Sequence, residues 1–423
     1  MATSFKPPSK SLTLRDYQVI ALIVFGIFVF AAVLVYINLN QLNHLRGGGE
    51  FYLPWMAGRA FLIDRYDPYS AYVPENVQEL VYDRPARSLE EPYITDIPFH
   101  LLLAYFPFSF LYEPEPARAI FTLFTELALL GLAYLSLRLT DWESPPILAG
   151  LTLLFCVFNF YAFQAVLEAT PVLILGFLYA GILYALRNEQ DELAGALVAV
   201  SCYHWEVGGP FLILVLLRAI HERRTRVLAG FAMLTAYLLV ISFLVYPDWL
   251  IPFLRANANN LRADFGYSTH TILSYFWPDI GGRVAWGLTI LLLSALVYEW
   301  TIARRSDARR FYWASCLSLA ATPLLGFRTE MENLVVLALP LALVFATTYE
   351  RWRRFGGFLM VLLLLGVLAL PWAIYFFAIP RFAQIAEQIL FLSYPVIAVI
   401  GLYWIRWWAI RPPRTWFDRA RIP

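Results

Sequence analysis

The chain has 423 residues, of which 60% are hydrophobic and 17% aromatic, with a net charge of +1 and a mean hydropathy of +0.61. Only 15% of the residues are charged, whereas about a quarter are charged in a soluble protein. This composition excludes an ordinary soluble domain. The charges are bunched between long apolar runs, which indicates a polytopic α-helical membrane protein, because an apolar stretch of about 20 residues crosses lipid as a helix.

The first predicted element is a transmembrane helix over residues 17–37. It follows Lys6, Lys10 and Arg15 and is too long for the apolar region of a cleavable signal peptide. A polar loop over residues 38–97 comes next. The further apolar segments are residues 97–112, 117–139, 146–163, 171–186, 193–220, 227–246, 284–303, 311–327, 334–349, 355–379 and 389–410. The chain is therefore predicted to be one integral membrane domain, residues 1–423, with about 12 spans.

Basic loops predict the orientation of these spans. Arginines are concentrated in residues 218–226, 304–310 and 351–354 and in the tail, residues 406–423. The positive-inside rule places these segments and both termini in the cytoplasm. The loops 38–97 and 247–283 then share the non-cytoplasmic face of the cell (inner or plasma) membrane, where they can form one cleft.

One apolar segment is too long for a single span. Residues 193–220 are interrupted by His204, Glu206 and Pro210, so they form either one kinked helix or two helices that return to the side from which they start. In the second case another segment must fail to cross, and the segment 97–112, with Pro98 and Pro107, is the candidate.

The most distinctive short motif is Gly47-Gly48-Gly49-Glu50, just after the first helix. Three glycines allow a sharp turn and close approach of the backbone to a ligand. Glu50 is then either a functional carboxylate at the membrane surface or the acidic first-turn residue of a short helix, where the helix dipole favours it.

Other polar residues of the first loop also have two interpretations. Asp67, between Tyr66 and Pro68, is typical of a structured corner, with Tyr69 packed on it. Asp96 and His100 open the next apolar segment, either as a helix cap and its neighbour or as functional groups.

The second loop and a later turn supply further candidates. The second loop contains Arg262 and His270 among amides and hydroxyls, a combination suited to sugar or phosphate recognition. Arg328 and Glu330 lie in a turn predicted to face the same side, either as a phosphate-binding pair or as an ion pair at a helix end. Glu126, His204 and Glu206 interrupt apolar segments, where ionisable groups persist when they are paired or useful.

The sequence contains no nucleotide-binding motif of the Walker A or Asp-x-Asp kind. A substrate delivered in the membrane, such as a lipid-linked one, fits the predicted geometry better than a nucleotide sugar does.

These features resemble the GT-C superfamily of membrane glycosyltransferases, and most closely glycosyltransferase family 87. The resemblance depends on Glu50-Phe51-Tyr52, Tyr66-Asp67-Pro68-Tyr69 and Asp96-Ile97-Pro98-Phe99, then on Gln164 through Pro171, Ala194-Gly195 through Pro210 with Arg223-Arg224, Thr322-Pro323 through Asn333, and Leu339-Pro340. The chain departs from the family pattern in having Glu50 where Asp is usual. It also has the His204–Glu206 region in place of a Lys, and Glu330-Met331-Glu332 where His is usual.

The resemblance implies a GT-C-like bundle and inverting transfer of a sugar from a polyprenyl-phosphate donor to a glycan, lipid or protein acceptor, with weak or no dependence on a divalent metal. It implies Glu50 as the base, Arg328 or Arg262 against the leaving phosphate, and Tyr52, Asp67, Tyr69, Asp96, His100, His270 and Glu330 as substrate-binding residues. The alternative is a non-catalytic relative or a transporter that binds or moves a lipid-linked glycan. A transporter is expected to contain internal repeats, and the sequence shows none that is convincing.

Overall fold

The computed structural model describes residues 14–40, 47–87, 90–260, 266–352 and 355–411. About 80% of the chain is helical. The described residues contain no strand, and their single isolated β-bridge joins Tyr267 to Thr329. The prediction of an all-α fold is confirmed.

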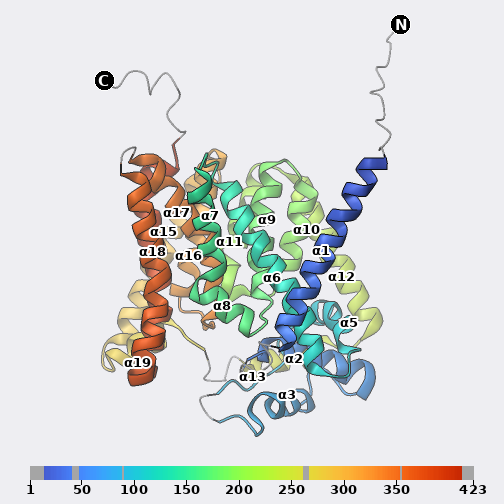
Figure 1. Ribbon diagram of the computed structural model, residues 1–423. Coiled ribbons are helices and arrows are strands. Elements are labelled where there is room, and N and C mark those ends of the chain that lie inside the picture. Colours follow the sequence, from blue (N-terminus) through green and yellow to red (C-terminus); the bar gives the residue numbers. More distant parts are fainter. Residues whose placement is uncertain (1–13, 41–46, 88–89, 261–265, 353–354, 412–423) are drawn as a thin grey trace, which may run out of the picture.

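The helices form a bundle whose long members run roughly side by side (Figure 1). In chain order the elements are α1 (Leu14–Asn40), α2 (Gly49–Arg59), η2 (Ala60–Asp64), α3 (Tyr72–Tyr82), α4 (Phe99–Leu102), η3 (Leu103–Tyr105), α5 (Phe106–Ser109), α6 (Pro114–Leu139), α7 (Pro146–Phe158), α8 (Phe160–Leu167), α9 (Val172–Arg187), α10 (Asp191–Ser201), α11 (Trp205–His221), α12 (Thr225–Val245), α13 (Leu250–Asn260), α14 (Thr269–Phe276), α15 (Gly281–Ala303), α16 (Ala308–Ala321), η4 (Thr322–Leu324), η5 (Glu332–Leu337), α17 (Ala338–Arg351), α18 (Gly356–Ala373), η6 (Ile374–Ala378) and α19 (Ile379–Ala409).

Among the described residues, five helical stretches are long and apolar enough to cross a membrane, or six if the bent pair α7 and α8 is one span. The five are Pro114–Leu139, Thr225–Val245, Gly281–Ala303, Glu332–Arg351 and Gly356–Ala409. The chain is therefore a membrane protein. The predicted number of 12 spans is not confirmed by this count.

Local sequence explains the break between α7 and α8. Asn159 has an extended backbone, with φ −66° and ψ 153°, and its side-chain oxygen accepts a hydrogen bond from the Ala162 N–H at 3.0 Å. Asparagine is a favoured N-cap because it satisfies one of the free N–H groups of a helix start. One helix ends and a new one begins at 44° to it.

The long segment 193–220 forms two helices, α10 and α11. Arg224, just after α11, makes a 2.7 Å ion pair with Asp191 at the start of α10 and donates a hydrogen bond to the Leu186 carbonyl. The two helices thus return to the end of the bundle from which they started, which is the second of the two predicted alternatives. We call this end, which also contains the Arg187–Asp141 pair, the basic end.

The segment 97–112 does not run the length of the bundle. Before it, the Tyr69 hydroxyl donates to the Ile97 carbonyl at 3.0 Å. After it, Arg59 donates to the Tyr112 carbonyl at 3.4 Å. Both contacts are with the α2–α3 region, so the segment begins and ends on the side opposite the basic end, which we call the α2 end.

Two buried apolar clusters hold the elements together. The larger one joins α6–α9, α11, α16, α17 and α19. The smaller one, rich in aromatic residues, packs α2 against α4, α5 and α6 around Phe51, Trp55, Phe99 and Phe121. Because buried aromatic groups contribute much apolar area, this cluster fixes α2, and with it Glu50, on the bundle.

The two long loops meet at the α2 end, where α2, α3 and α13 lie together (Figure 1). The Asn260 amide at the end of α13 donates to the Asp96 carboxylate at 2.8 Å. Tyr267 of the second loop pairs through its backbone with Thr329, next to Glu330. Parts of both loops and the turn that contains Arg328 therefore lie at the same end of the bundle.

Candidate active site

The glycine turn delivers Glu50 to the bundle. Gly47 and Gly48 have φ values of 141° and 91°. Residues other than glycine rarely adopt this backbone conformation. Gly49 starts α2 and packs directly on Tyr93, so that an added Cβ would lie 2.1 Å from the Tyr93 hydroxyl oxygen. Glycine is therefore required at positions 47 and 48 by the backbone conformation, and at position 49 because a side chain has no room.

Two residues from neighbouring elements hold this turn. The Glu168 carboxylate, just after α8, accepts hydrogen bonds from the N–H groups of Gly48 at 3.0 Å and Gly49 at 3.3 Å. Arg118 of α6 is buried, donates to the Leu167 carbonyl at 2.6 Å and lies against Gly48. The turn is thus tied to both α6 and α8.

Glu50 lies in a group of carboxylates. One carboxylate oxygen each from Glu50, Glu91 and Glu330 can be chosen so that all three lie within 4.8 Å of one another. These residues come from α2, from the segment before α4 and from the turn before η5, so three parts of the chain that are far apart in sequence converge here. We call these three residues the acidic cluster.

More charged groups surround the acidic cluster. Burial, followed by the charges of Glu332, Asp96 and Glu168, raises the pKa of Glu50 to about 8, while nearby His204 opposes the shift. Burial, and then Glu332, raises the pKa of Glu168 to about 7, although the Gly48 N–H lowers it. Like charges in a desolvated place favour the neutral form, so the group shares protons near neutral pH.

His204 contributes a cationic group to this region. Its Nδ1 lies 2.5 Å from the Glu206 carboxylate. Burial alone would lower the pKa of the imidazole, but the negative charges of Glu206, Asp96 and Glu50 outweigh burial and raise it. Its Nε2 is buried and has no hydrogen-bond partner within the described part of the chain. A protonated His204 can therefore offer one N–H to a ligand.

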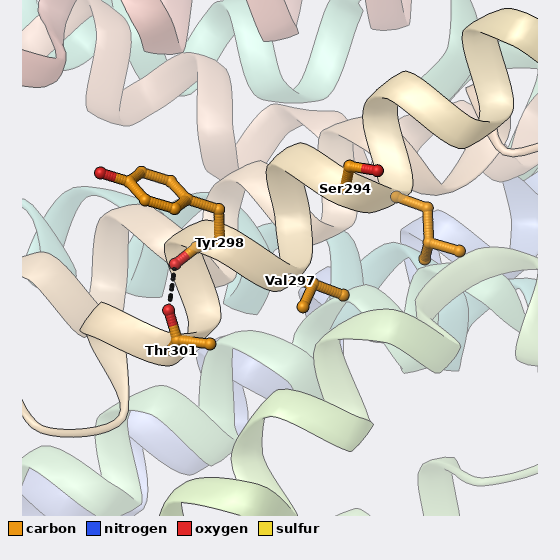
Figure 2. Close-up of a pocket in the computed structure, with 5 residues that line it drawn as sticks. Ser294, Val297, Tyr298 and Thr301 are labelled. Atoms are coloured by element: carbon orange, nitrogen blue, oxygen red, sulfur yellow. Dashed lines mark hydrogen bonds between the residues drawn. The ribbon is translucent and has the colours of Figure 1, made fainter.

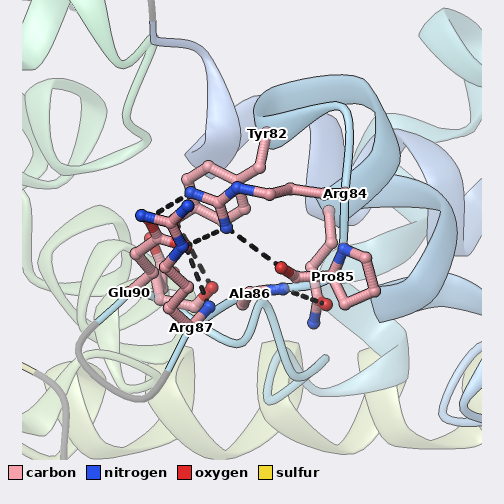
Figure 3. A network of polar contacts seen from close by, with 8 residues as sticks. Tyr82, Arg84, Pro85, Ala86, Arg87 and Glu90 are labelled. Atoms are coloured by element: carbon pink, nitrogen blue, oxygen red, sulfur yellow. Dashed lines mark hydrogen bonds and ion pairs between the residues drawn. The ribbon is translucent and has the colours of Figure 1, made fainter.

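A polar network places Glu91 (Figure 3). Glu90 accepts two hydrogen bonds of 2.6 Å from the Arg84 guanidinium and one of 2.9 Å from the Arg87 N–H. The Gln78 side chain accepts from the Ala86 N–H at 2.9 Å and donates to the Pro92 carbonyl at 2.8 Å. The segment on either side of Glu91 is thereby anchored to α3.

The structure brings some of the predicted site residues together and keeps others apart. Glu50, Asp96 and Glu330 lie in or beside the acidic cluster. Tyr52 is buried, with its ring 5.8 Å from the guanidinium of Arg118, which lies against Gly48.

Four of the other predicted residues have contacts elsewhere. Asp67 accepts the Tyr69 N–H at 2.9 Å, and the Tyr69 hydroxyl binds the Ile97 carbonyl, so both form the structured corner. His100 packs on Trp249 and His270 on Trp286. The Arg328 side chain is exposed, and Arg262 lies outside the described residues.

Sequence reasoning did not single out Glu91, Glu168 or Arg118 as site residues. Glu91 follows Glu90 in a loop rich in acids, and nothing in the sequence distinguishes the two. Glu168 and Arg118 were detectable in principle, because each stands at the edge of an apolar segment, where a charge that is buried needs a partner.

The acidic cluster is able to hold a divalent cation. Oxygen atoms that share one hard cation at 2.0–2.6 Å lie up to about 5 Å apart, and the cluster spacing of 4.8 Å is within this limit. Protons shared among the same carboxylates are the other way to neutralise them. The two possibilities have opposite consequences for Glu50. A bound cation would occupy its carboxylate, whereas proton sharing leaves the carboxylate able to accept a proton.

A surface depression on α15 is unrelated to this site. It is lined by Leu293, Ser294, Val297, Tyr298 and Thr301, all from one helix (Figure 2). The Thr301 hydroxyl donates to the Tyr298 carbonyl of its own helix. The depression contains no ionisable group beyond Tyr298 and is an ordinary feature of an apolar helix surface.

Comparison with known proteins matches residues 98–326 to the model of glycosyltransferase family 87. A search of the curated proteins finds no match. The matched part includes Arg118, Glu168 and His204, whereas Glu50, Glu91 and Glu330 lie on either side of it.

Proposed function

This chain belongs to glycosyltransferase family 87, and on that basis we propose that it transfers a sugar from a polyprenyl-phosphate donor to an acceptor hydroxyl, with inversion, at the non-cytoplasmic face of the membrane. The α2 end of the bundle is the part that faces this side. Membership of the family supports sugar transfer in general. The donor, the face and the stereochemistry are our proposal.

The environment of Glu50 is the observation that favours this reaction. A general base is most effective when its pKa lies near the working pH, and burial together with the neighbouring carboxylates raises the pKa of Glu50 to about 8. An isolated glutamate, with a pKa near 4.5, would be a far weaker base.

In the proposed step, the acceptor oxygen attacks the anomeric carbon of the sugar from the face opposite the phosphate. A new carbon–oxygen bond forms as the bond to the phosphate oxygen breaks. Glu50 takes the proton of the acceptor hydroxyl, and the polyprenyl phosphate leaves with the bonding electron pair. Atoms and charges balance without a redox partner.

The leaving phosphate needs a cationic or hydrogen-bonding partner. Arg328 and Arg262 remain proposals from the sequence for this role. His204 is added to them because it is close enough to Glu50 for their charges to interact and has a buried, unpartnered Nε2 among the described residues. Tyr52, Asp96 and Glu330 are proposed to contact the acceptor or sugar from the positions described above.

The test compares Glu50→Gln with wild type in membranes supplied with a panel of radiolabelled polyprenyl-phosphate monosaccharides. Loss of a general base is expected to lower turnover by about 10²- to 10⁴-fold. Glu75→Gln is the matched control, because Glu75 is an exposed glutamate of α3. Unchanged turnover in Glu50→Gln would contradict the assignment. A wild-type protein that binds these lipids without forming product would indicate the non-catalytic alternative.

A further inference from the structure

The turn that carries Glu50 is held by hydrogen bonds from outside its own loop. Both come to one oxygen: Glu168 Oε2 accepts the N–H groups of Gly48 at 3.0 Å and Gly49 at 3.3 Å. These N–H groups belong to the start of α2, where the first turn of a helix has no partners of its own. The carboxylate thus caps a helix whose second residue is Glu50.

The backbone next to Glu168 is itself held in place. It follows α8 directly, and the neighbouring Leu167 carbonyl accepts the Arg118 guanidinium at 2.6 Å. Arg118 is 2% exposed and belongs to α6. The capping side chain therefore extends from backbone at the end of α8 that is tied to α6.

Within the described part of the chain, no other side chain is hydrogen-bonded to the N–H groups of this turn. Gly48 adopts a left-handed conformation, and no side chain of α2 caps its own N-terminus. The position of Glu50 relative to the bundle consequently depends on contacts made from outside α2, by Glu168 at the turn and by the aromatic cluster below it.

We propose that Glu168 is a positioning residue for Glu50: by capping Gly48 and Gly49 it fixes where the Glu50 carboxylate meets the acceptor. This inference rests on the proposed function. A displacement of about 1 Å in a reacting group can lower a rate by about a hundredfold, so loss of the cap should affect the chemical step more than substrate binding.

The choice of substitutions follows from the geometry. Both hydrogen bonds go to a single oxygen, and a glutamine carbonyl oxygen has two lone pairs that can accept both. Glu168→Gln therefore keeps the cap, whereas Glu168→Ala removes it. We expect Glu168→Ala to lower kcat by about 10- to 100-fold with little change in KM, and Glu168→Gln to recover most of the lost kcat.

The pH dependence supplies a readout that a purely structural role would not move. The charge of Glu168 is among the effects that raise the pKa of Glu50, so its removal in Glu168→Gln lowers that pKa. The acid limb of the kcat profile then moves to lower pH. The other groups that act on Glu50 remain in place: Glu91, Asp96, His204, Glu330 and Glu332.

Hydrogen–deuterium exchange separates this inference from the proposed function. Glu168→Ala should speed exchange of the Gly48 and Gly49 amides, measured in a peptide that begins at or before residue 45, and Glu168→Gln should not. Faster exchange with unchanged kcat, while Glu50→Gln is inactive, would overturn the positioning role and leave the proposed function intact. Equal loss of kcat in both variants would also overturn it. Unchanged turnover in Glu50→Gln would instead contradict the proposed function.

Discussion

Glu90 and Glu91 are adjacent in the chain, yet their carboxylates lie in opposite electrostatic environments. Hydrogen bonds from Arg84 and Arg87 lower the pKa of Glu90 to about 2. Burial, and then the charges of Glu50 and Glu332, raise the pKa of Glu91 well above its usual value. One side chain turns outwards to a guanidinium, and the next turns inwards to other carboxylates, with the acidic cluster around Glu91 and the polar network of Figure 3 around Glu90.

This difference predicts how stability depends on pH. Glu50, Glu91 and Glu168 all have raised pKa values in the folded protein, so near neutral pH the folded state binds more protons than the unfolded state. Its stability must then fall as the pH rises, from about 4.5 through 7 to 8 and above. We expect the apparent Tm in detergent to decrease by several degrees between pH 6 and pH 9.

The two neighbours provide the control for this prediction. Glu91→Gln removes one carboxylate that must ionise in a buried place, so this variant should lose less stability on the alkaline side than wild type. Glu90→Gln removes a group already ionised above pH 4.5, and should change the Tm by a similar small amount at every pH from 6 to 9. Parallel curves for wild type and Glu91→Gln would contradict the prediction.

The glycine turn predicts a steric effect at Gly49. An added Cβ would lie 2.1 Å from the Tyr93 hydroxyl oxygen and 2.4 Å from two of its ring carbons. Overpacking of a buried site typically costs about 1–3 kcal/mol, so Gly49→Ala should lower both the Tm and turnover.

The matched control is Gly287→Ala in α15, where no heavy atom lies within 4 Å of an added Cβ. Alanine is favoured over glycine in a helix by up to about 1 kcal/mol, so this variant should be as stable as wild type or more so. A Gly49→Ala protein as stable and active as Gly287→Ala would show that the turn has room to move.

The sequence predicted the helical membrane class because composition and segment length determine it directly. It also predicted that the two loops and the Arg328 turn share one face, because the distribution of arginines orients the segments. It did not predict which acids converge. Glu90 and Glu91, or Glu168 and Glu330, look alike in a sequence, and only packing decides which side chain points inwards.

The segments at 97–112 and 193–220 show a similar limit. Each is apolar enough to be interpreted as a span. What shows otherwise are contacts made only in the folded chain, between Tyr69 and Ile97 at the start of the first segment and between Asp191 and Arg224 on either side of the second. These contacts join residues that are 28 and 33 positions apart, which no local pattern reports. The signal available in the sequence was the prolines and the His204 interruption, and these left two alternatives.

The proposed base predicts the effect of a chelator. A cation held by the acidic cluster would occupy the Glu50 carboxylate and compete with the proton that it must accept. Removing divalent cations with EDTA should therefore leave most of the turnover in place, whereas Glu50→Gln removes about 10²- to 10⁴-fold. Loss of activity with EDTA that Mg²⁺ or Mn²⁺ restores in wild type would show that a metal, and not a proton, neutralises this cluster.

The last prediction concerns orientation. The positive-inside rule places the basic end in the cytoplasm, and the proposed use of a lipid-linked donor places the α2 end on the opposite face. Single cysteines at two exposed positions test this, Glu79→Cys in α3 and Arg305→Cys between α15 and α16. The background has Cys156, Cys202 and Cys316 replaced, since Cys202 is only half-buried. A membrane-impermeant maleimide added to intact cells whose outer barrier is permeable should label position 79 and spare position 305 until the membrane is opened.

The reverse pattern would put the acidic cluster in the cytoplasm, where nucleotide sugars are available, and would contradict the proposed face and donor together.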